Sequence, residues 1–389
     1  MTSMAVTIAA ISRDRRARTR FWRAGLPPYA GDAHFVTPLL LDQHARWHPE
    51  HPFFAHAEAQ HFVAVRDGRD VGRIAACVDA RHDEQHGNNI GFFGWFECER
   101  NEATAAALLD AAAAWLRDRD RDTMRGPLSY STNGLSGLLV EDKRPGPPVV
   151  DMPYNPSWYA DLLEGWGLRG AKDLVALWAD TPQAGLERLE RIVKRIERRG
   201  SYRVRPVRTD RAGFAADIEH VLQIYNCAWE KNWGFVPMTA AEIRHEARSM
   251  RKILDPSLLL FADHEGEPVA FSLTLPDIHQ ALHAIRGRLW PWSILRFLIA
   301  KRGIRQGRMV TLGVIPRHRR AGLETALILR SVEGARRLGW VGAECSWVLE
   351  DNDLMIAAIK HIGGAIYRRY RIFESSIAES APASAIRSA

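Results

Sequence analysis

The chain has 389 residues, of which 46% are hydrophobic and 25% are charged, and its formal net charge is +7. This length and composition indicate a globular protein with two domains and exclude a disordered or fibrous chain. No run approaches the roughly 20 apolar residues of a membrane-spanning helix, and residues 5–11 lack the preceding basic residue of a secretory signal. We therefore expect a cytoplasmic protein.

The cysteines and the charged residues narrow the class of protein further. The four cysteines are far apart without metal-ligand spacing, so reduced thiols are expected and no metal site is predicted. Positive charge gathers in residues 13–23 and 188–205. Such clusters attract phosphates of CoA, lipid head groups or RNA, or they are simply solvated surface.

Elements of the first half follow one another in a readable order. The predicted elements are a hairpin of residues 61–65 and 71–77, a strand at 89–97, a helix at 102–117, an extended segment at 125–130 and a helix from Trp158 to Gly167. The hairpin turn at Asp67 and Gly68 is a favourable one. The next helix is amphipathic, with Thr181 as its cap, Pro182 in its first turn and Gly200 at its end. Its apolar stripe indicates core packing.

The second half repeats this order. Its elements are a hairpin of residues 258–262 and 268–275, a strand at 309–314, an arginine-rich turn at 317–322, a helix at 323–338, a strand at 342–349 and a helix from Asn352 to Gly363. The chain thus predicts two copies of one α/β unit with mixed central sheets flanked by helices. Residues 98–101 of the first copy lack the glycine turn, which indicates a degenerate copy.

Domain boundaries follow from these elements. We expect a basic arm at 1–30, an N-terminal degenerate unit at 31–180, a linker helix at 181–200, a C-terminal ligand-binding unit at 201–374 and a disordered tail at 375–389.

The turn before the helix at 323–338 has the chemistry of a pyrophosphate site. A helix N-terminus presents unpaired N–H groups and partial positive charge, and Gly322 lets the backbone approach a ligand closely. The sequence from Arg319 to Glu324 resembles the acyl-CoA signature of the GCN5-related N-acetyltransferase (GNAT) superfamily. Glu324 departs from it, because the superfamily has a small residue there.

Asn352 supports the same resemblance, since the superfamily has an asparagine at this strand end that contacts the pantetheine arm. The resemblance implies acyl-CoA as donor substrate, with no metal. It places the donor in the gap after Val314, the pyrophosphate on the amides of residues 319–325 and the oxyanion on a backbone N–H of the strand. The implied cofactor-binding residues are Leu312, Val314, Arg317, Arg319, Arg320, Ala321, Gly322, Leu323, Thr325 and Asn352.

Catalytic residues are less clearly marked. The amine acceptor must lose a proton before it attacks, which requires a base or an apolar pocket. Acidic candidates in the second copy are Glu230, Asp277, Glu344 and Glu350, and we rank Asp277 and Glu350 first because each follows a predicted central strand. The superfamily's usual tyrosine acid is Ile359 here, so Tyr367 or Tyr370 is expected instead, with Tyr370 preferred.

Aromatic residues suggest where an acceptor binds. Trp229, Trp233 and Phe235 surround one turn, and Trp290 and Trp292 belong to an apolar insertion with basic flanks. Such an insertion is typical of a segment on a membrane surface or along an acyl groove, and equally of a buried helix that caps the core.

Over nearly the whole chain the pattern resembles tandem-copy acyltransferase-like proteins of bacteria that include ceramide synthases. This resemblance implies transfer of a long acyl chain to a sphingoid-base-like amine, with peripheral contact to the anionic inner face of the membrane and without nucleic acid. Three alternatives stay open: a Fem-type transferase that uses aminoacyl-tRNA, an N-acetyltransferase of small molecules, and a non-enzymatic binding protein. CoA affinity separates the acyl-CoA-dependent enzymes from the other two.

Overall fold

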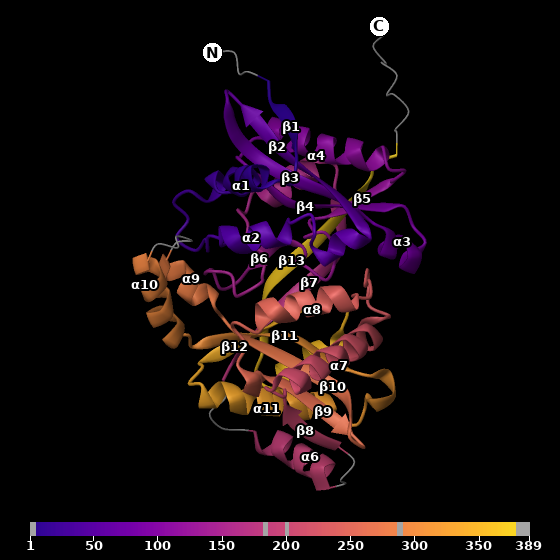
Figure 1. Ribbon diagram of the computed structural model, residues 1–389, viewed down its shortest axis with the longest axis vertical. Helices are drawn as coiled ribbons and strands as arrows, with labels where there is room; N and C mark the ends of the chain where they lie inside the picture. The colour runs from indigo at the N-terminus through magenta and orange to yellow at the C-terminus, as the bar shows by residue number, and fades with distance from the viewer. Residues whose placement is uncertain (1–4, 182–185, 199–201, 286–290, 379–389) are drawn as a thin grey trace.

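The computed structural model describes residues 5–181, 186–198, 202–285 and 291–378, and thirteen strands of these residues form one continuous sheet (Figure 1). The strands of the first half are β1 (Thr7–Ile11), β2 (Ala57–Arg66), β3 (Arg69–Asp79), β4 (Ile90–Cys98), β5 (Thr123–Gly126), β6 (Leu138–Asp142) and β7 (Arg169–Asp180). Its helices are α1 (Arg15–Ala24), α2 (Leu40–Arg46), α3 (Ala80–His86), α4 (Glu102–Arg117) and α5 (Tyr159–Trp166).

The second half has the corresponding elements. Its strands are β8 (Tyr202–Pro206), β9 (Leu259–His264), β10 (Glu267–Pro276), β11 (Gln306–Val314), β12 (Gly342–Leu349) and β13 (Ala365–Ser376). Its helices are α6 (Glu187–Arg198), α7 (Arg211–Trp229), α8 (Ala240–Met250), α9 (His279–Ile285), α10 (Pro291–Arg302), α11 (Leu323–Arg337) and α12 (Asp353–His361).

The predicted repeat is confirmed by the strand pairing. The sheet order is β1-β2-β3-β4-β5-β13-β7-β12-β11-β10-β9-β8, with β6 paired to β13. Each half contains an antiparallel hairpin and one parallel pair, β4 with β5 and β11 with β12. Each half also has a register shift on the strand that enters its parallel pair. The two copies therefore share their strand topology and the register shift on the corresponding strand.

Local chemistry explains why the predicted elements form. Both hairpin turns contain a non-glycine residue and a glycine in the left-handed region, with φ of 51° and 72° at Asp67 and Gly68 and 52° and 88° at Glu265 and Gly266. Asn352 caps α12 by accepting the N–H of Met355 at 3.2 Å. The predictions for α4 and β12 match the structure residue for residue.

The last strand joins the two halves into one sheet. β13 comes from the C-terminal end of the chain, yet it lies between β5 and β7, and it appears in yellow inside the upper half of Figure 1. The mixed central sheets of the two units form one continuous sheet, because β13 and β7 bridge both units. The boundaries between the two units and the linker helix remain a proposal.

Two expectations about the ends of the chain are wrong. The stretch at 1–30 is not a solvated arm, because β1 pairs with β2 and Phe21 of α1 is fully buried. The tail does not begin at 375, because Ser375 and Ser376 complete β13 and Ile377 is buried. In α1 the arginines alternate with apolar residues that pack on the sheet. The composition of this segment alone did not distinguish such a packed helix from a basic arm. The remaining tail residues, 379–389, lie outside the described residues.

Helices cover both faces of the sheet. In the first half, α4 and α5 pack on one face and α1 on the other. In the second half, α11 packs on one face and α7 on the opposite face. Val193 of the linker helix α6 and Leu186, the residue before this helix, pack on α11, as the apolar stripe predicted. Its predicted first turn at Pro182 and its predicted end at Gly200 lie outside the described residues.

A charged histidine connects the two halves. His56 Nδ1 lies 2.8 Å from Asp79, and its Nε2 lies 3.4 Å from Glu242 of α8. Burial lowers the pKa of His56, but the hydrogen bonds and charges of the two carboxylates outweigh burial and raise it to about 9.

Stability should therefore fall in alkaline solution. The pKa of His56 rises on folding from 6.5 to about 9, so its contribution is complete below pH 6.5 and is lost as the pH rises through 9. We expect the free energy of unfolding, measured with urea, to drop by on the order of 2–3 kcal/mol across this window. His56→Gln should remove this drop, whereas His48→Gln, at an exposed histidine, should keep it. An identical pH dependence in His56→Gln would contradict the assignment.

Candidate active site

The parallel strands β11 and β12 separate partway along their length. They pair from Gln306 with Gly342 to Met309 with Cys345, and the pairing then stops although both strands continue. Beyond this point β12 pairs only with β7 among the described strands. From Val310 onward the edge of β11 that faces β12 has no partner strand among the described residues, and we call this divergence of the two strands the slot. An extended ligand with amide groups can hydrogen-bond to such a strand edge.

A bulge lies at the start of the slot. Thr274 pairs with Met309 and Leu273 pairs with Thr311, which leaves Val310 as an extra residue on β11. A bulge re-aims backbone groups that would otherwise join the ladder. The backbone at Val310 is therefore the natural position for an N–H group that stabilises an oxyanion.

The arginine-rich turn closes the top of this slot. Arg320 and Gly322 adopt φ of 74° and 81°, and α11 starts at Leu323 without a side-chain cap. The first N–H groups of α11 therefore receive no side-chain cap, which is the feature on which the predicted pyrophosphate site depends. Ala321, Gly322 and Thr325 are partly exposed here.

The side chains of the turn have different roles. Arg319 is directed to the protein, because its Nη2 donates to the carbonyl of Ala228 at 2.7 Å. His318 is buried, and burial followed by the charge of Arg317 lowers its pKa. Its Nε2 accepts from Arg317 at 3.0 Å, so its Nδ1 donates to Tyr202 at 3.1 Å. Arg320 is exposed and has no ion pair among the described residues, so it can contact a phosphate.

Several of the predicted cofactor-binding residues have structural roles. Leu312, Val314 and Leu323 are buried in the apolar cluster under α11. Asn352 is used as the cap of α12. A Cβ on Gly322 would lie 3.0 Å from Ile196 of α6, so the linker helix borders the turn.

A buried polar cluster lies at the bottom of the slot, on the two paired strands. Arg308 and Glu344 are opposite each other in the β11–β12 register and are 4% and 0% exposed. Glu344 accepts hydrogen bonds from the hydroxyls of Ser346 and Tyr367. Arg308 donates to Ser346 Oγ at 2.9 Å and to the carbonyl of Asp151 at 2.9 Å. A fully buried carboxylate bonded to two hydroxyls can accept a proton through either of them.

The three ranked catalytic residues are not brought together. Asp277 is buried next to the first-half loop, where its Oδ1 accepts the N–H of Val150 at 2.9 Å. Burial raises the pKa of Asp277 to about 7, and the charge of Glu344 adds to this. Tyr370 is fully buried, its hydroxyl has no partner among the described residues, and burial and then Glu344 raise its pKa. Both residues thus lie in the electrostatic field of Glu344.

Glu350 lies apart from this cluster. Its side chain is 41% exposed and pairs with Arg369 at 3.3 Å. From the sequence, Glu344 was ranked below Glu350 as a catalytic candidate. In the structure Glu344 is the carboxylate that lies in the buried polar cluster. The available signal was a charged residue within an otherwise apolar strand, since such residues are rarely buried without a specific reason.

The aromatic residues that were predicted to bind the acceptor lie in different parts of the structure. Trp229 stacks on Tyr225 and lies against Gly313 of β11, where a Cβ would approach its ring to 2.4 Å. Trp233 lies under Arg125, and the neighbouring carbonyl of Gly234 accepts from Thr132 at 2.7 Å. The turn that holds Trp233 and the buried Phe235 therefore connects the two halves. Trp290 lies outside the described residues.

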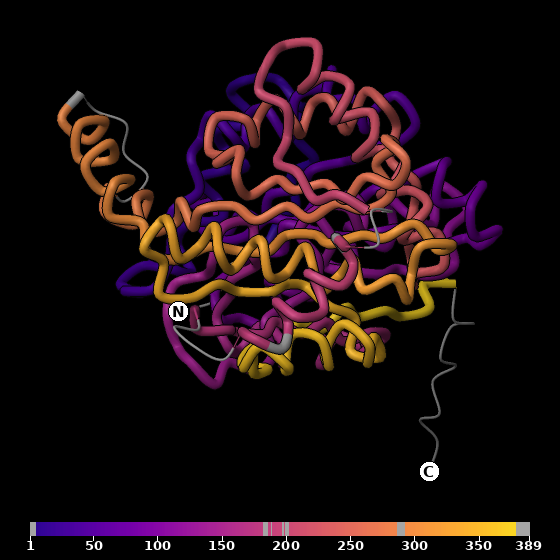
Figure 2. The backbone as a smooth tube through the Cα atoms, turned by 90° about the horizontal axis from the view of Figure 1, so that it is seen from below, coloured from indigo at the N-terminus to yellow at the C-terminus, as the bar shows by residue number. Residues whose placement is uncertain are grey.

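Helix α10 is an exposed apolar surface. Trp292 is 80% exposed, and Ile294, Leu295, Leu298 and Ile299 are exposed beside it. The α9–α10 segment stands out from the body in Figure 2. The interpretation as a buried helix that caps the core is therefore wrong for residues 292–299. Phe297 alone of these packs inward, near Val36 and Leu282.

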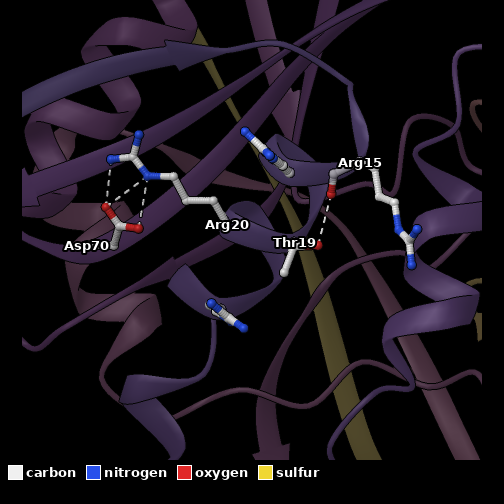
Figure 3. A pocket seen from close by; sticks show the side chains of 6 residues that line it. Arg15, Thr19, Arg20 and Asp70 are labelled. Atoms are coloured by element: carbon white, nitrogen blue, oxygen red, sulfur yellow. Dashed lines mark hydrogen bonds and ion pairs between the residues drawn. The ribbon is translucent and has the colours of Figure 1, made fainter.

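A basic groove of about 500 Å³ lies on α1, lined by Arg15, Arg16, Thr19, Arg20, Arg23 and Asp70 (Figure 3). Asp70 pairs with Arg20 at 2.7 Å. Arg15, Arg16 and Arg23 have no ion-pair partner within the described ranges, so the groove has a net positive charge. Among all the residues that the structure describes, no group of three metal-ligating side chains is found.

Comparison with known proteins identifies the fold and the family. No protein-family model matches the chain. Of solved structures, a tandem GNAT protein from the clavulanic acid biosynthesis pathway covers 97% of this chain and 100% of its own, with a TM-score of 0.59 and 13% identity. A GCN5-related N-acetyltransferase from Sphaerobacter thermophilus covers 97% of each chain with a TM-score of 0.52 and 13% identity. The expected tandem GNAT fold is thereby confirmed.

Sequence relatives define the family. The bacterial ceramide synthase of Caulobacter vibrioides is 34% identical over 356 residues, which is 90% of this chain and 92% of that protein. Protein YghO of Escherichia coli is 30% identical over 356 residues, which is 90% of each chain. The chain therefore belongs to the family of the bacterial ceramide synthase and is an N-acyltransferase of the tandem GNAT fold.

Proposed function

We propose that this acyltransferase moves a long acyl chain from acyl-CoA to the primary amine of a single-chain lipid such as a sphingoid base. The observation that carries the proposal is the 34% identity, over nine-tenths of both chains, to a protein named bacterial ceramide synthase. The slot between β11 and β12 and the uncapped start of α11 support acyl-CoA as the donor. The exposed apolar face of α10 supports a lipid acceptor.

The proposed reaction uses groups at the base of the slot. The amine nitrogen attacks the thioester carbonyl carbon, the carbonyl oxygen takes negative charge next to the backbone N–H groups at the Val310 bulge, and the C–S bond then breaks. The amine proton passes to Glu344 through the hydroxyl of Ser346 or Tyr367. The CoA thiolate takes a proton from solvent or from Tyr370, whose hydroxyl lacks a partner among the described residues.

Mass spectrometry of the reaction products tests this function. The purified protein is incubated with a sphingoid base and either palmitoyl-CoA or acetyl-CoA. We expect an N-palmitoyl product that forms faster than the N-acetyl product. A preference for acetyl-CoA would indicate an N-acetyltransferase of small molecules. The absence of CoA binding, with retention of charged tRNA, would indicate a Fem-type transferase.

We also propose that the protein acts in the cytoplasm and contacts anionic membranes peripherally. No helix within the described ranges is long and apolar enough to cross a membrane. The exposed side chains of α10 and its basic end at Lys301 and Arg302 suit the boundary between acyl chains and head groups. The groove on α1 adds positive charge that anionic head groups attract.

Vesicle binding should depend on α10. We expect Leu295→Glu to weaken co-sedimentation with phosphatidylglycerol-containing vesicles about tenfold, because one apolar contact is lost and one anion is added. Leu354→Glu is the matched control, since Leu354 is 87% exposed on α12. The double variant Arg16→Glu and Arg23→Glu should weaken only the salt-sensitive part of binding. Equal binding of Leu295→Glu and the wild type would contradict the proposal that α10 contacts the membrane.

A further inference from the structure

An apolar pocket lies between α11, α12 and the sheet, separate from the buried polar cluster. Its volume is about 40 Å³, and its walls include Val332 of α11, Ile359 and Ile362 of α12, and Met309 and Cys345 of the sheet. The lining consists almost wholly of carbon atoms. A pocket with such a lining favours hydrocarbon along most of its length.

The position of the pocket connects it to the slot. Met309 and Cys345 form the last pair before β11 and β12 separate, and both side chains line the pocket. The pocket therefore begins where the slot ends, on the side of the sheet covered by α11 and α12. A donor that lies in the slot with its thioester near Val310 has the pocket directly in line with its acyl chain.

Two buried hydroxyl groups, of Thr274 and Ser331, lie in the wall of the pocket. Thr274 and Ser331 line the pocket and are 3% and 4% exposed. Neither hydroxyl has a hydrogen-bond partner among the described residues. Thr274 pairs with Met309 across β10 and β11, so its hydroxyl lies at the end of the pocket next to the slot. Buried hydroxyls are normally satisfied, and a carbonyl at this end of a bound chain would satisfy Thr274.

We propose that this pocket receives the first methylene groups of the donor's acyl chain and so favours long acyl-CoA over acetyl-CoA. The inference rests on the proposed function and deepens it by assigning the site that distinguishes donors. A single water occupies at least about 10–15 Å³ of such space, so 40 Å³ accommodates only a few methylene groups. The pocket therefore separates acetyl from longer chains, but it does not measure the full length of a chain.

Filling the pocket is the direct test. Ser331→Leu puts a larger apolar side chain into it, Ser331→Ala removes the hydroxyl without filling the space, and Leu329→Phe enlarges a residue of α11 that faces α6 instead. Affinities for CoA, acetyl-CoA and octanoyl-CoA are measured by calorimetry. We expect Ser331→Leu to reduce the gain in affinity from acetyl to octanoyl about 10- to 50-fold, the gain from burying two or three methylene groups. CoA itself should bind unchanged, and both controls should keep the gain.

The possible outcomes separate the inference from the function on which it rests. If the wild type fails to bind CoA, the proposed function is overturned and the pocket assignment with it. If the wild type binds CoA and Ser331→Leu keeps the full gain, only the pocket assignment is overturned. Val332→Phe fills the pocket from another position and replaces Ser331→Leu if that variant does not fold.

Photolabelling provides an independent measurement on the unaltered protein. An acyl-CoA with a diazirine on an early carbon of its chain should label peptides that contain Val332, Ile359 or Ile362. Excess CoA should prevent this labelling. CoA-sensitive labelling of the first-half loop at Val149 and Val150 or of α8 would place the chain on the opposite face of the sheet and overturn the inference.

Discussion

Gly322→Trp is expected to lower the affinity for CoA roughly 100-fold or more while the protein remains folded. Gly322 is the residue before α11, its φ of 81° suits glycine, and it has no side chain to cover the N–H groups of the helix start. An indole at this position would cover those groups and shift α6 at Ile196. Calorimetric titration with CoA and thermal unfolding together measure the effect.

Three further variants separate ligand binding from backbone strain. Gly339→Trp is the matched control, because Gly339 follows the other end of α11 with a φ of 69° and has open space within 4 Å of the position that a Cβ would take. It should bind CoA normally. Arg320→Glu leaves α6 in place and should weaken CoA binding about tenfold or more through charge reversal, whereas Arg337→Glu at the other helix end should not. Normal CoA affinity in a folded Gly322→Trp would disprove the pyrophosphate site.

Glu344→Gln is expected to reduce the rate of N-acyl transfer about 10²- to 10⁴-fold, the usual contribution of a general base. Glutamine has nearly the same shape but cannot take the proton that Ser346 or Tyr367 would pass on. CoA affinity should stay near that of the wild type, since Glu344 is placed at the base of the slot and not at the turn. Single-turnover kinetics with palmitoyl-CoA separate the chemical step from binding.

Glu350→Gln is the matched control, because it removes a carboxylate just beyond the end of the same strand. Glu350 is partly exposed and pairs with Arg369, so its loss should change the rate little. Tyr367→Phe together with Ser346→Ala should approach the effect of Glu344→Gln if both hydroxyls carry the proton. A folded Glu344→Gln with wild-type rates would exclude Glu344, and Asp277 would then be the next carboxylate to replace.

Some features of the proposed site are local in sequence, and others depend on contacts between distant residues. The arginine-rich turn, Gly322 and the following helix were predictable because a helix start, a glycine and its spacing are local features. The role of Arg319 was not, since its partner, the carbonyl of Ala228, is 91 residues away in sequence. Likewise, Glu344 and Tyr367 are in contact only because β7 lies between β12 and β13 and pairs with both.

Local sequence patterns were enough to predict the repeat, most strands and helices, and the turn that is proposed to bind the donor. Periodicity, turn residues and caps act over a few residues, so they can be recognised in one chain. Three features became visible only in the folded protein: the two copies share one sheet, β1 joins that sheet while α1 packs on it, and Glu344 is buried where Glu350 is exposed. Burial and charge pairing depend on which distant strands become neighbours, and that long-range pairing is not encoded in local periodicity.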